Sequence, residues 1–157
     1  MSTHLSAVVA CVCLFASTSA AQLAGPGLSW SGSSGNFARS FLPSCQNLPV
    51  VAVPGETVTL SVWGDSMSPF ALFAAGSGSQ CLVFQGIGAG LVLDFPIATV
   101  TFGVLTQQSP CLSCPPGHQD LQFVLPPGLP PGTALALQGA ALASGNPSFT
   151  VAITGTV

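Results

Sequence analysis

Hydrophobic and polar residues alternate along several short stretches of the chain. In "ETVTLSVW" (56–63), valine or leucine at positions 58, 60 and 62 alternates with threonine or serine at 57, 59 and 61. This period of two, with many β-branched residues, predicts a strand that buries one face. The turn signal "VPG" (53–55) precedes it, and "LPVVAV" (48–53) is predicted to be its short partner strand.

Similar runs follow, separated by stretches rich in glycine and proline. They are "PFALFAA" (69–75), "CLVF" (81–84), "LVLDF" (91–95), "ATVTFGVL" (98–105), "DLQFVL" (120–125), "TALALQGAAL" (133–142) and "SFTVAITGTV" (148–157). In the last run, Phe149, Val151, Ile153 and Val157 share one face. Only "TALALQGAAL" also fits a helix, and the glycines and prolines around it favour a strand.

These runs predict an all-β fold, an antiparallel β-sandwich of about eight short strands, with a β-barrel as the alternative. We expect the strands near 58–62, 100–104, 121–125 and 149–153 to fill the core with their apolar faces. The predicted domain spans residues 42–157. Residues 22–41 before it are a Gly/Ser-rich N-terminal segment, in which "GLSWSGSSG" (27–35) is expected to be a loop or an irregular edge.

The first residues, "MSTHLSAVVACVCLFASTSAAQ", resemble a secretory signal peptide. The apolar run from Ala7 to Ala16 has the length of a signal core and is too short to span a bilayer. Ser19 and Ala21 suit cleavage before Gln22, with cleavage one residue earlier as an alternative. The predicted leader is therefore 1–21, and we expect a secreted, extracellular or cell-envelope protein with no membrane span.

Charge is nearly absent from the chain. It contains one arginine, Arg39, and four acidic residues, Glu56, Asp65, Asp94 and Asp120, while 48% of its residues are hydrophobic. Nucleic-acid binding needs many cationic side chains to neutralise phosphates, so this composition excludes that class of partner. The hydrophobic content also argues against a disordered chain.

Four cysteines remain outside the predicted leader: Cys45, Cys81, Cys111 and Cys114. Four cysteines allow three pairings, and we favour Cys45 with Cys81 and Cys111 with Cys114. The alternatives for "CLSCPPGH" (111–118) are a redox pair and a zinc site completed by His118. A redox pair needs a stabilised thiolate at a helix start, which the following prolines oppose. Exported thiols usually oxidise rather than bind zinc, so a disulfide-closed loop is the preferred interpretation and no cofactor or metal is expected.

Other candidate chemistry is sparse. Gly64-Asp65-Ser66 resembles the nucleophile block of SGNH-type esterases, and His118 with Asp120 would have to complete a relay with Ser66. The order and spacing of these residues differ from that pattern, so a bend capped by Asp65 and Ser66 is the simpler interpretation. The acidic residues form no calcium loop and no evident glycosidase pair, and are expected to be solvated turn residues.

Trp63 breaks the alternation of its strand, because it falls on the polar face with Thr59 and Ser61. It is thus a candidate exposed aromatic and our one tentative ligand contact, together with Trp30 as a possible stacking surface. Packing at the edge of the core is the simpler alternative.

The chain after about residue 42 resembles a group of uncharacterised exported proteins of planctomycete-type environmental bacteria. "LPSC", "ETVTLSVWG", "PFALFAAGSGSQCLV" and "FVLPPGLPPGTALALQGAALASGNPSFTVAIT" carry the resemblance, and "TQQSPCLSCPPGHQD" departs from it. The resemblance implies a compact secreted β-sandwich and brings no catalytic residues.

Together these features predict a secreted, non-enzymatic β-sandwich with a structural, adhesive or cell-surface interaction role. A carbohydrate-binding module using Trp63 is the alternative, and a small hydrolase at Ser66 and His118 is a third hypothesis. The expected partner is an extracellular protein or a polysaccharide, and the sequence leaves the oligomeric state open.

Overall fold

The computed structural model describes residues 25–42 and 45–157, and the predicted leader (1–21) lies outside them. The described chain forms strands joined by turns and loops. The strands are β1 (Gly27–Gly32), β2 (Phe37–Ser40), β3 (Asn47–Val51), β4 (Thr57–Gly64), β5 (Pro69–Ala75), β6 (Gly78–Val83), β7 (Gly90–Leu93), β8 (Ala98–Val104), β9 (Gln107–Gln108), β10 (Gly117–Val124), β11 (Ala134–Ala143) and β12 (Asn146–Thr156). None of the described part forms a helix with the length and apolarity needed to cross a bilayer.

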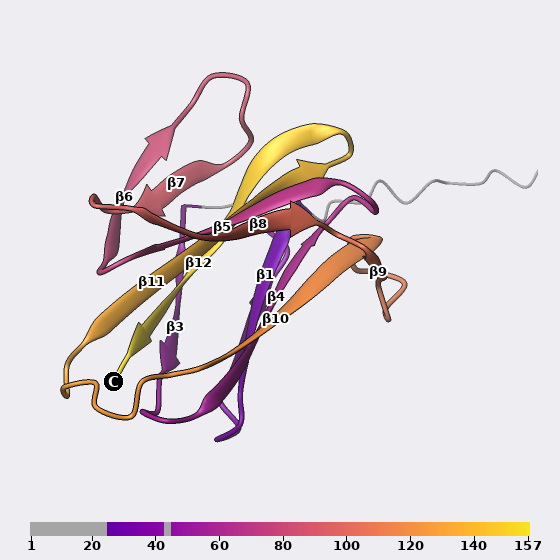
Figure 1. Cartoon of the computed structure of the whole chain (residues 1–157). Helices are drawn as coiled ribbons and strands as arrows, with labels where there is room; N and C mark the ends of the chain where they lie inside the picture. The colour runs from indigo at the N-terminus through magenta and orange to yellow at the C-terminus, as the bar shows by residue number, and fades with distance from the viewer. Residues whose placement is uncertain (1–24, 43–44) are drawn as a thin grey trace, which may run out of the picture.

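Two five-stranded sheets make the body of the molecule (Figure 1). Sheet A has the order β2-β1-β4-β10-β9 and sheet B the order β3-β12-β11-β5-β8. Neighbouring strands are antiparallel, except that β3 runs parallel to β12. The predicted all-β sandwich is confirmed, and the described sheets do not close into a barrel.

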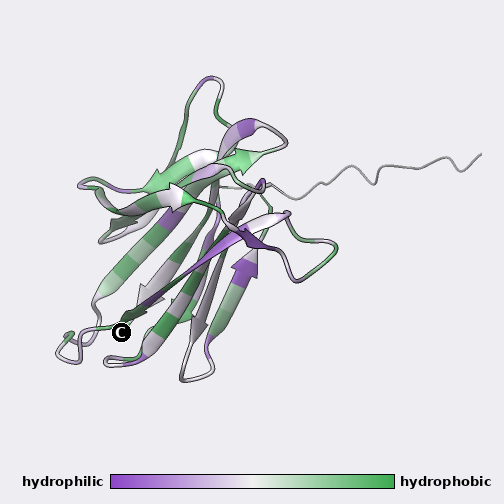
Figure 2. Ribbon diagram, turned by 45° about the vertical axis from the view of Figure 1, so that its right-hand side comes forward, coloured by the Kyte–Doolittle hydropathy of each residue, from purple (hydrophilic) through white to green (hydrophobic). Residues whose placement is uncertain are grey.

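The main core lies between the two sheets. Leu28 and Trp30 of β1, Leu60 of β4, Leu72 of β5 and Ile153 of β12 are almost fully buried there. In Figure 2, hydrophobic segments alternate with neutral or polar ones along the strands, as expected when each strand turns one face inward. The predicted inward face of residues 58–62 is confirmed, because its three apolar side chains are 0% exposed.

The N-terminal Gly/Ser-rich segment was wrongly expected to be a loop or an irregular edge. Its residues 27–32 form β1, which pairs with both β2 and β4. Leu28 and Trp30 point into the core, and the Trp30 ring meets Phe123 edge to face with centroids 6.1 Å apart. The small residues between them hid this alternation in the sequence.

The expected pairing of "LPVVAV" with the following strand is also wrong. This stretch is β3, which joins β12 at one edge of sheet B. In the last run, Phe149 does not share a face with Val151 and Ile153, because it packs in a second cluster outside the main core. The β11–β12 ladder shifts register between Gln138 and Ala140, next to the partner of Phe149.

Strand β8 differs most from its expected role. It forms an edge of sheet B, and its residues Val100, Phe102 and Val104 are 52%, 80% and 43% exposed. Phe102 lies opposite Ala71 of β5, on the side of sheet B away from the core. Alternation predicts two faces of a strand but not which face another sheet will cover.

The β6–β7 hairpin forms a third layer on the outer side of sheet B (Figure 1). Leu91 and Leu93 of β7 pack there with Ala75, Ala136 and Phe149 in the second cluster. The Cys45–Cys81 disulfide attaches β6 to the segment that leads into β3, as predicted.

Gln138 fixes this hairpin to the sheet. Its side chain is 0% exposed, and its Oε1 accepts a hydrogen bond from the Val92 N–H at 2.8 Å. Its Nε2 donates to the carbonyls of Gly90 (2.9 Å) and Thr150 (2.8 Å). A buried amide with all these groups paired stabilises one position of the hairpin, because any displacement would leave polar groups unpaired.

Candidate functional site

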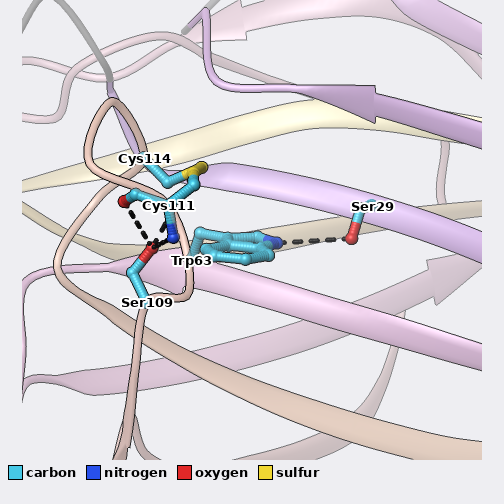
Figure 3. The surroundings of a disulfide bond; sticks show 5 residues. All are labelled: Ser29, Trp63, Ser109, Cys111 and Cys114. Carbon is cyan, nitrogen blue, oxygen red and sulfur yellow. Dashed lines mark hydrogen bonds between the residues drawn. A yellow bond between two sulfur atoms is a disulfide. The ribbon is translucent and has the colours of Figure 1, made fainter.

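The loop between β9 and β10 is closed by a disulfide bond between Cys111 and Cys114, as predicted. Ser109 reinforces the loop, because its hydroxyl accepts from the Cys111 N–H at 3.4 Å and donates to the Cys111 carbonyl at 3.2 Å. The closed loop lies beside Trp63 (Figure 3). Both sulfurs are in the disulfide, so neither is the free thiolate that a zinc site or a nucleophilic redox cysteine requires.

A shallow cavity of about 360 Å³ lies against this loop. Its lining residues are Ser66, Gln108, Ser109, Cys111, Leu112, Cys114 and Pro116. Ser66 therefore reaches a concave surface, but the described residues around that surface do not include His118 or Asp120. Within the described ranges, no three histidine, cysteine or acidic side chains gather as a metal-binding group.

Ser66, His118 and Asp120 do not form a hydrogen-bonded relay among the described residues, although the chain at Gly117 runs against Ser66. Gly117 approaches the turn at Ser66 so closely that a Cβ on it would lie 2.7 Å from the Ser66 Cα. The His118 ring instead stacks on Trp63, with centroids 4.6 Å apart and an angle of 17°. Its Nδ1 is buried without a hydrogen-bond partner among the described residues. In a Ser-His-Asp triad, one ring nitrogen of the histidine is hydrogen-bonded to a carboxylate and the other to the serine hydroxyl.

Trp63 is not the exposed aromatic residue that its place on the polar face suggested. It is 6% exposed, and its Nε1 donates to the Ser29 hydroxyl at 3.3 Å. Phe41 meets it edge to face at 5.4 Å, while His118 covers one of its ring faces. These neighbours bury Trp63 on the outer side of sheet A, so its ring is not open for stacking.

The rest of that outer side carries polar and aromatic groups from four strands. The register places Arg39, Ser29, Ser61 and Asp120 in one row, and Phe37, Ser31, Thr59 and Gln122 in the next. We call these eight residues the polar face. The Arg39 guanidinium lies 5.9 Å from the centre of the Phe37 ring, which is 63% exposed. Both side chains are thus available to a ligand.

Two acidic residues are held inside hydrogen-bonded turns. Burial would by itself raise the pKa of Glu56, but hydrogen bonds from Ser34 and the Val53 N–H outweigh it and lower the pKa. The hydroxyls of Ser77 and Ser79, with backbone N–H groups, lower the pKa of Asp94. Glu56 is 6% exposed, so the expectation that all the acidic residues are solvated is wrong for it.

Asp65 does not simply cap its own bend, as was expected. Its carboxylate accepts from the N–H groups of Ser144 (3.0 Å) and Gly145 (2.7 Å), at the distant turn between β11 and β12. The acidic groups that sequence analysis considered for calcium or catalysis therefore serve separate turns, apart from the exposed Asp120.

The outer side of sheet B carries an exposed apolar surface. Phe102 and Val104 of β8 lie opposite Ala71 and Pro69 of β5. We call these four residues the apolar face.

This face adjoins an apolar pocket of about 270 Å³. The pocket is lined by Pro69, Phe70, Ala71, Ile87, Ala140, Ala141, Leu142, Pro147, Ser148 and Phe149. The residues come from β5, from the β11–β12 hairpin and from the tip of the β6–β7 hairpin. The pocket and the apolar face together offer one continuous apolar surface to a partner.

No family model matches the sequence, and no curated protein matches it significantly. Among solved structures, a chitin binding domain from Burkholderia pseudomallei is similar over 71% of this chain, at 14% identity and a TM-score of 0.33. The match spans 56% of that domain's chain.

The sequence pattern did not identify Phe102, Phe37 and Arg39 as exposed surface residues. Phe102 was assigned to the core, and Phe37 and Arg39 lie in the Gly/Ser-rich N-terminal segment, for which no strand was predicted. No signal in the sequence pointed to the exposure of Phe102, because an exposed edge strand usually carries a charged residue or a proline and residues 98–104 have neither.

Proposed function

We propose that this protein is a secreted, non-enzymatic β-sandwich that acts in the cell envelope or extracellular matrix by associating through its apolar face. The observation that carries this proposal is the exposure of Phe102, at 80%, beside an apolar pocket. Exposed apolar surfaces that continue into a pocket mark interaction sites, because covering them removes apolar area from water.

The frame that holds this surface suits an extracellular setting. Two disulfides, Cys45–Cys81 and Cys111–Cys114, close separate loops, and such bonds persist in oxidising compartments. The chain has one arginine and four acidic residues, so salt has few charges to screen. His118 stacks on Trp63 and is not hydrogen-bonded to Ser66 or Asp120, which supports a role without catalysis.

Co-sedimentation of the mature protein with envelope material from the cells that export it tests this function. We expect Phe102→Ser to weaken binding about tenfold or more, since it removes the largest exposed apolar group of the face. Phe37→Ser is the matched control, because Phe37 is also exposed but belongs to sheet A. Equal binding by the two variants, or no binding by the unchanged protein, would refute the proposal.

A second candidate function is carbohydrate binding at the polar face. The specific observation in its favour is the exposed Phe37 beside Arg39, with Asp120 and Gln122 two strands beyond β1. Aromatic rings pack against the C–H groups of sugars, while charged and amide side chains form hydrogen bonds with sugar hydroxyls. Trp63 lies beside this surface, covered by Phe41 and His118, and would not contact the sugar.

Pull-down with insoluble chitin, cellulose and starch tests this second function. Phe37→Ala and Asp120→Asn should each reduce binding, while Phe102→Ala should leave it unchanged. Retention on none of the three polymers would remove the support for carbohydrate binding.

A further inference from the structure

Strand β8 is the one edge strand of the two large described sheets that is longer than five residues and carries neither charge nor proline. Edge strands are commonly blocked by shortness, charge or proline. At the edges of sheet A, β2 has four residues and carries Arg39, and β9 has two residues. At the other edge of sheet B, β3 contains Pro49. The seven residues of β8, "ATVTFGV", contain neither charge nor proline.

The hydrogen bonds near the end of β8 show which of its backbone groups are free. The Leu105 N–H donates to the Ser68 carbonyl at 2.9 Å, so Leu105 turns its N–H toward β5. The direction of these bonds alternates along an antiparallel pair. Phe102 and Val104 therefore direct their N–H and C=O groups away from β5. The residue opposite Val104 on β5 is Pro69. Proline has no N–H, so it could not donate a hydrogen bond to Val104, which is consistent with Val104 directing its backbone groups away from β5.

A β-bulge limits the regular part of this edge. The β5–β8 ladder steps from Leu72–Thr101 to Phe73–Thr99, so Val100 is the extra residue. Thr101 to Leu105, which follow the bulge, continue the regular pairing with the β5 side, and Gly103 is at the centre of this segment.

We propose that β8 pairs antiparallel with β8 of a second copy of this chain, about a two-fold axis at Gly103. In this register Phe102 of each copy lies opposite Val104 of the other, and both outward-directed backbone groups of each residue are satisfied. Gly103 lies opposite Gly103 of the second copy in a pair without hydrogen bonds, where the two backbones approach most closely. Glycine has no side chain that would clash at this position. The two sheets B then form one continuous sheet.

Side chains and charge favour this partner. Phe102 and Val104 lie on the same outer side of sheet B, so each packs beside the other across the axis. Because the segment 95–105 has no charged residue, no like charges meet across the two-fold axis. The two-fold relation closes the assembly at two copies, since β8 is used by each. This pairing rests on the proposed function, for which it names a partner of the apolar face.

Sedimentation velocity of the mature protein from about 5 µM to 1 mM, combined with amide exchange followed by NMR, tests the pairing. We expect a concentration-dependent shift from monomer to dimer. The amides of Phe102 and Val104 should exchange fast in the monomer and at least about tenfold more slowly in the dimer, while Gly103 and Leu105 stay protected in both.

Two variants make the test specific. Val104→Pro removes an N–H that no described strand uses, so it should keep the fold and abolish the dimer. Phe102→Lys places charge at the interface and should weaken dimerisation about tenfold or more. Phe37→Lys, on sheet A, is the matched control and should dimerise like the unchanged protein.

The outcomes separate this inference from the proposed function. A protein that stays monomeric up to 1 mM overturns the pairing, and envelope binding that still depends on Phe102 would leave the proposed function standing. A dimer that resists Val104→Pro and leaves the Phe102 and Val104 amides unprotected also overturns the pairing, because association then uses side chains without the strand edge.

Discussion

At the scale of single residues, the few charged groups of this protein hold turns together. Glu56 lies below Gly32, where a Cβ would come within 2.4 Å of the carboxylate. Its oxygens accept from the Ser34 hydroxyl at 2.5 Å and from the Val53 N–H at 2.9 Å. This carboxylate therefore joins the β1–β2 turn to the turn before β4. A buried carboxylate such as Glu56 is stable in the folded protein only where several donors surround it.

Glu56→Gln should lower the free energy of unfolding at pH 7 by about 1–2 kcal/mol, because charged acceptors form the stronger hydrogen bonds. Urea denaturation measures this change, with Asp120→Asn at an exposed site as the control. No difference between the two variants would show that the Glu56 hydrogen bonds contribute little.

Acid should act through the same group. The pKa of Glu56 is lowered from its ordinary value of 4.5, because hydrogen bonds to the carboxylate outweigh its burial. The ionised form therefore stabilises the folded state above that value, and this stability is lost as the pH falls through the folded pKa. Urea midpoints from pH 7 to pH 2 should fall less for Glu56→Gln than for the unchanged protein. Parallel curves would contradict this assignment.

At the scale of elements, two hairpins depend on side chains from elsewhere in the chain. The turn between β11 and β12 places Ser144 at a φ of 52° and Gly145 at 76°, which suits glycine better than serine. The Asp65 carboxylate compensates by accepting both N–H groups of this turn. The β6–β7 hairpin depends in the same way on Gln138.

Asp65→Ala should destabilise the protein by about 1–2 kcal/mol, because two N–H groups lose a charged acceptor. Ser66→Ala, at the neighbouring exposed residue, should change stability by less than about 0.5 kcal/mol. Thermal unfolding of both variants measures the difference. A loss in Ser66→Ala as large as in Asp65→Ala would mean that the bend itself, and not the carboxylate, is what matters.

Gln138→Leu should cost about 2–4 kcal/mol, because it leaves the Val92 N–H and two carbonyls buried without partners. Amide exchange at Val92 should accelerate more than exchange in β4, since the hairpin loses its anchor first. Gln122→Leu, on the polar face, is the matched exposed control. Uniform acceleration across the protein would indicate that the hairpin and the sandwich unfold together.

At the scale of the whole molecule, the two disulfides close loops of very different length. Cys45 and Cys81 are 36 residues apart, whereas Cys111 and Cys114 are 3 apart. A longer closed loop restricts the unfolded chain more and therefore stabilises the folded state more. The long link also joins the hairpin layer to sheet B, so it supports the side of the molecule that carries the apolar face.

Replacing both Cys45 and Cys81 by serine should lower stability by about 3–4 kcal/mol, and the same change at Cys111 and Cys114 by about 1–2 kcal/mol. Urea unfolding of the two double variants compares them directly. The reverse order would mean that the short loop stabilises the fold through contacts around Trp63 rather than through chain entropy.

The sequence by itself determined the local features of this protein. Period-two alternation gave the strand class and the inward face of residues 58–62, and the cysteine spacing with the predicted export led to the two disulfides. Most of these are short-range properties, since side chains alternate along any strand and Cys111 and Cys114, 3 residues apart, can bond wherever the fold goes. That pair leaves Cys45 and Cys81 to bond with each other.

Only the tertiary structure decided which apolar faces are covered. Trp30 entered the core although glycine and serine surround it, Trp63 was buried by Phe41 and His118, and Phe102 was left in solvent although its strand reads as core. Each outcome depends on the strand order of a sheet and on what lies above it. The alternation of apolar and polar residues does not encode the strand order or the neighbouring layer, because it separates the two faces of a strand without specifying which face another sheet covers.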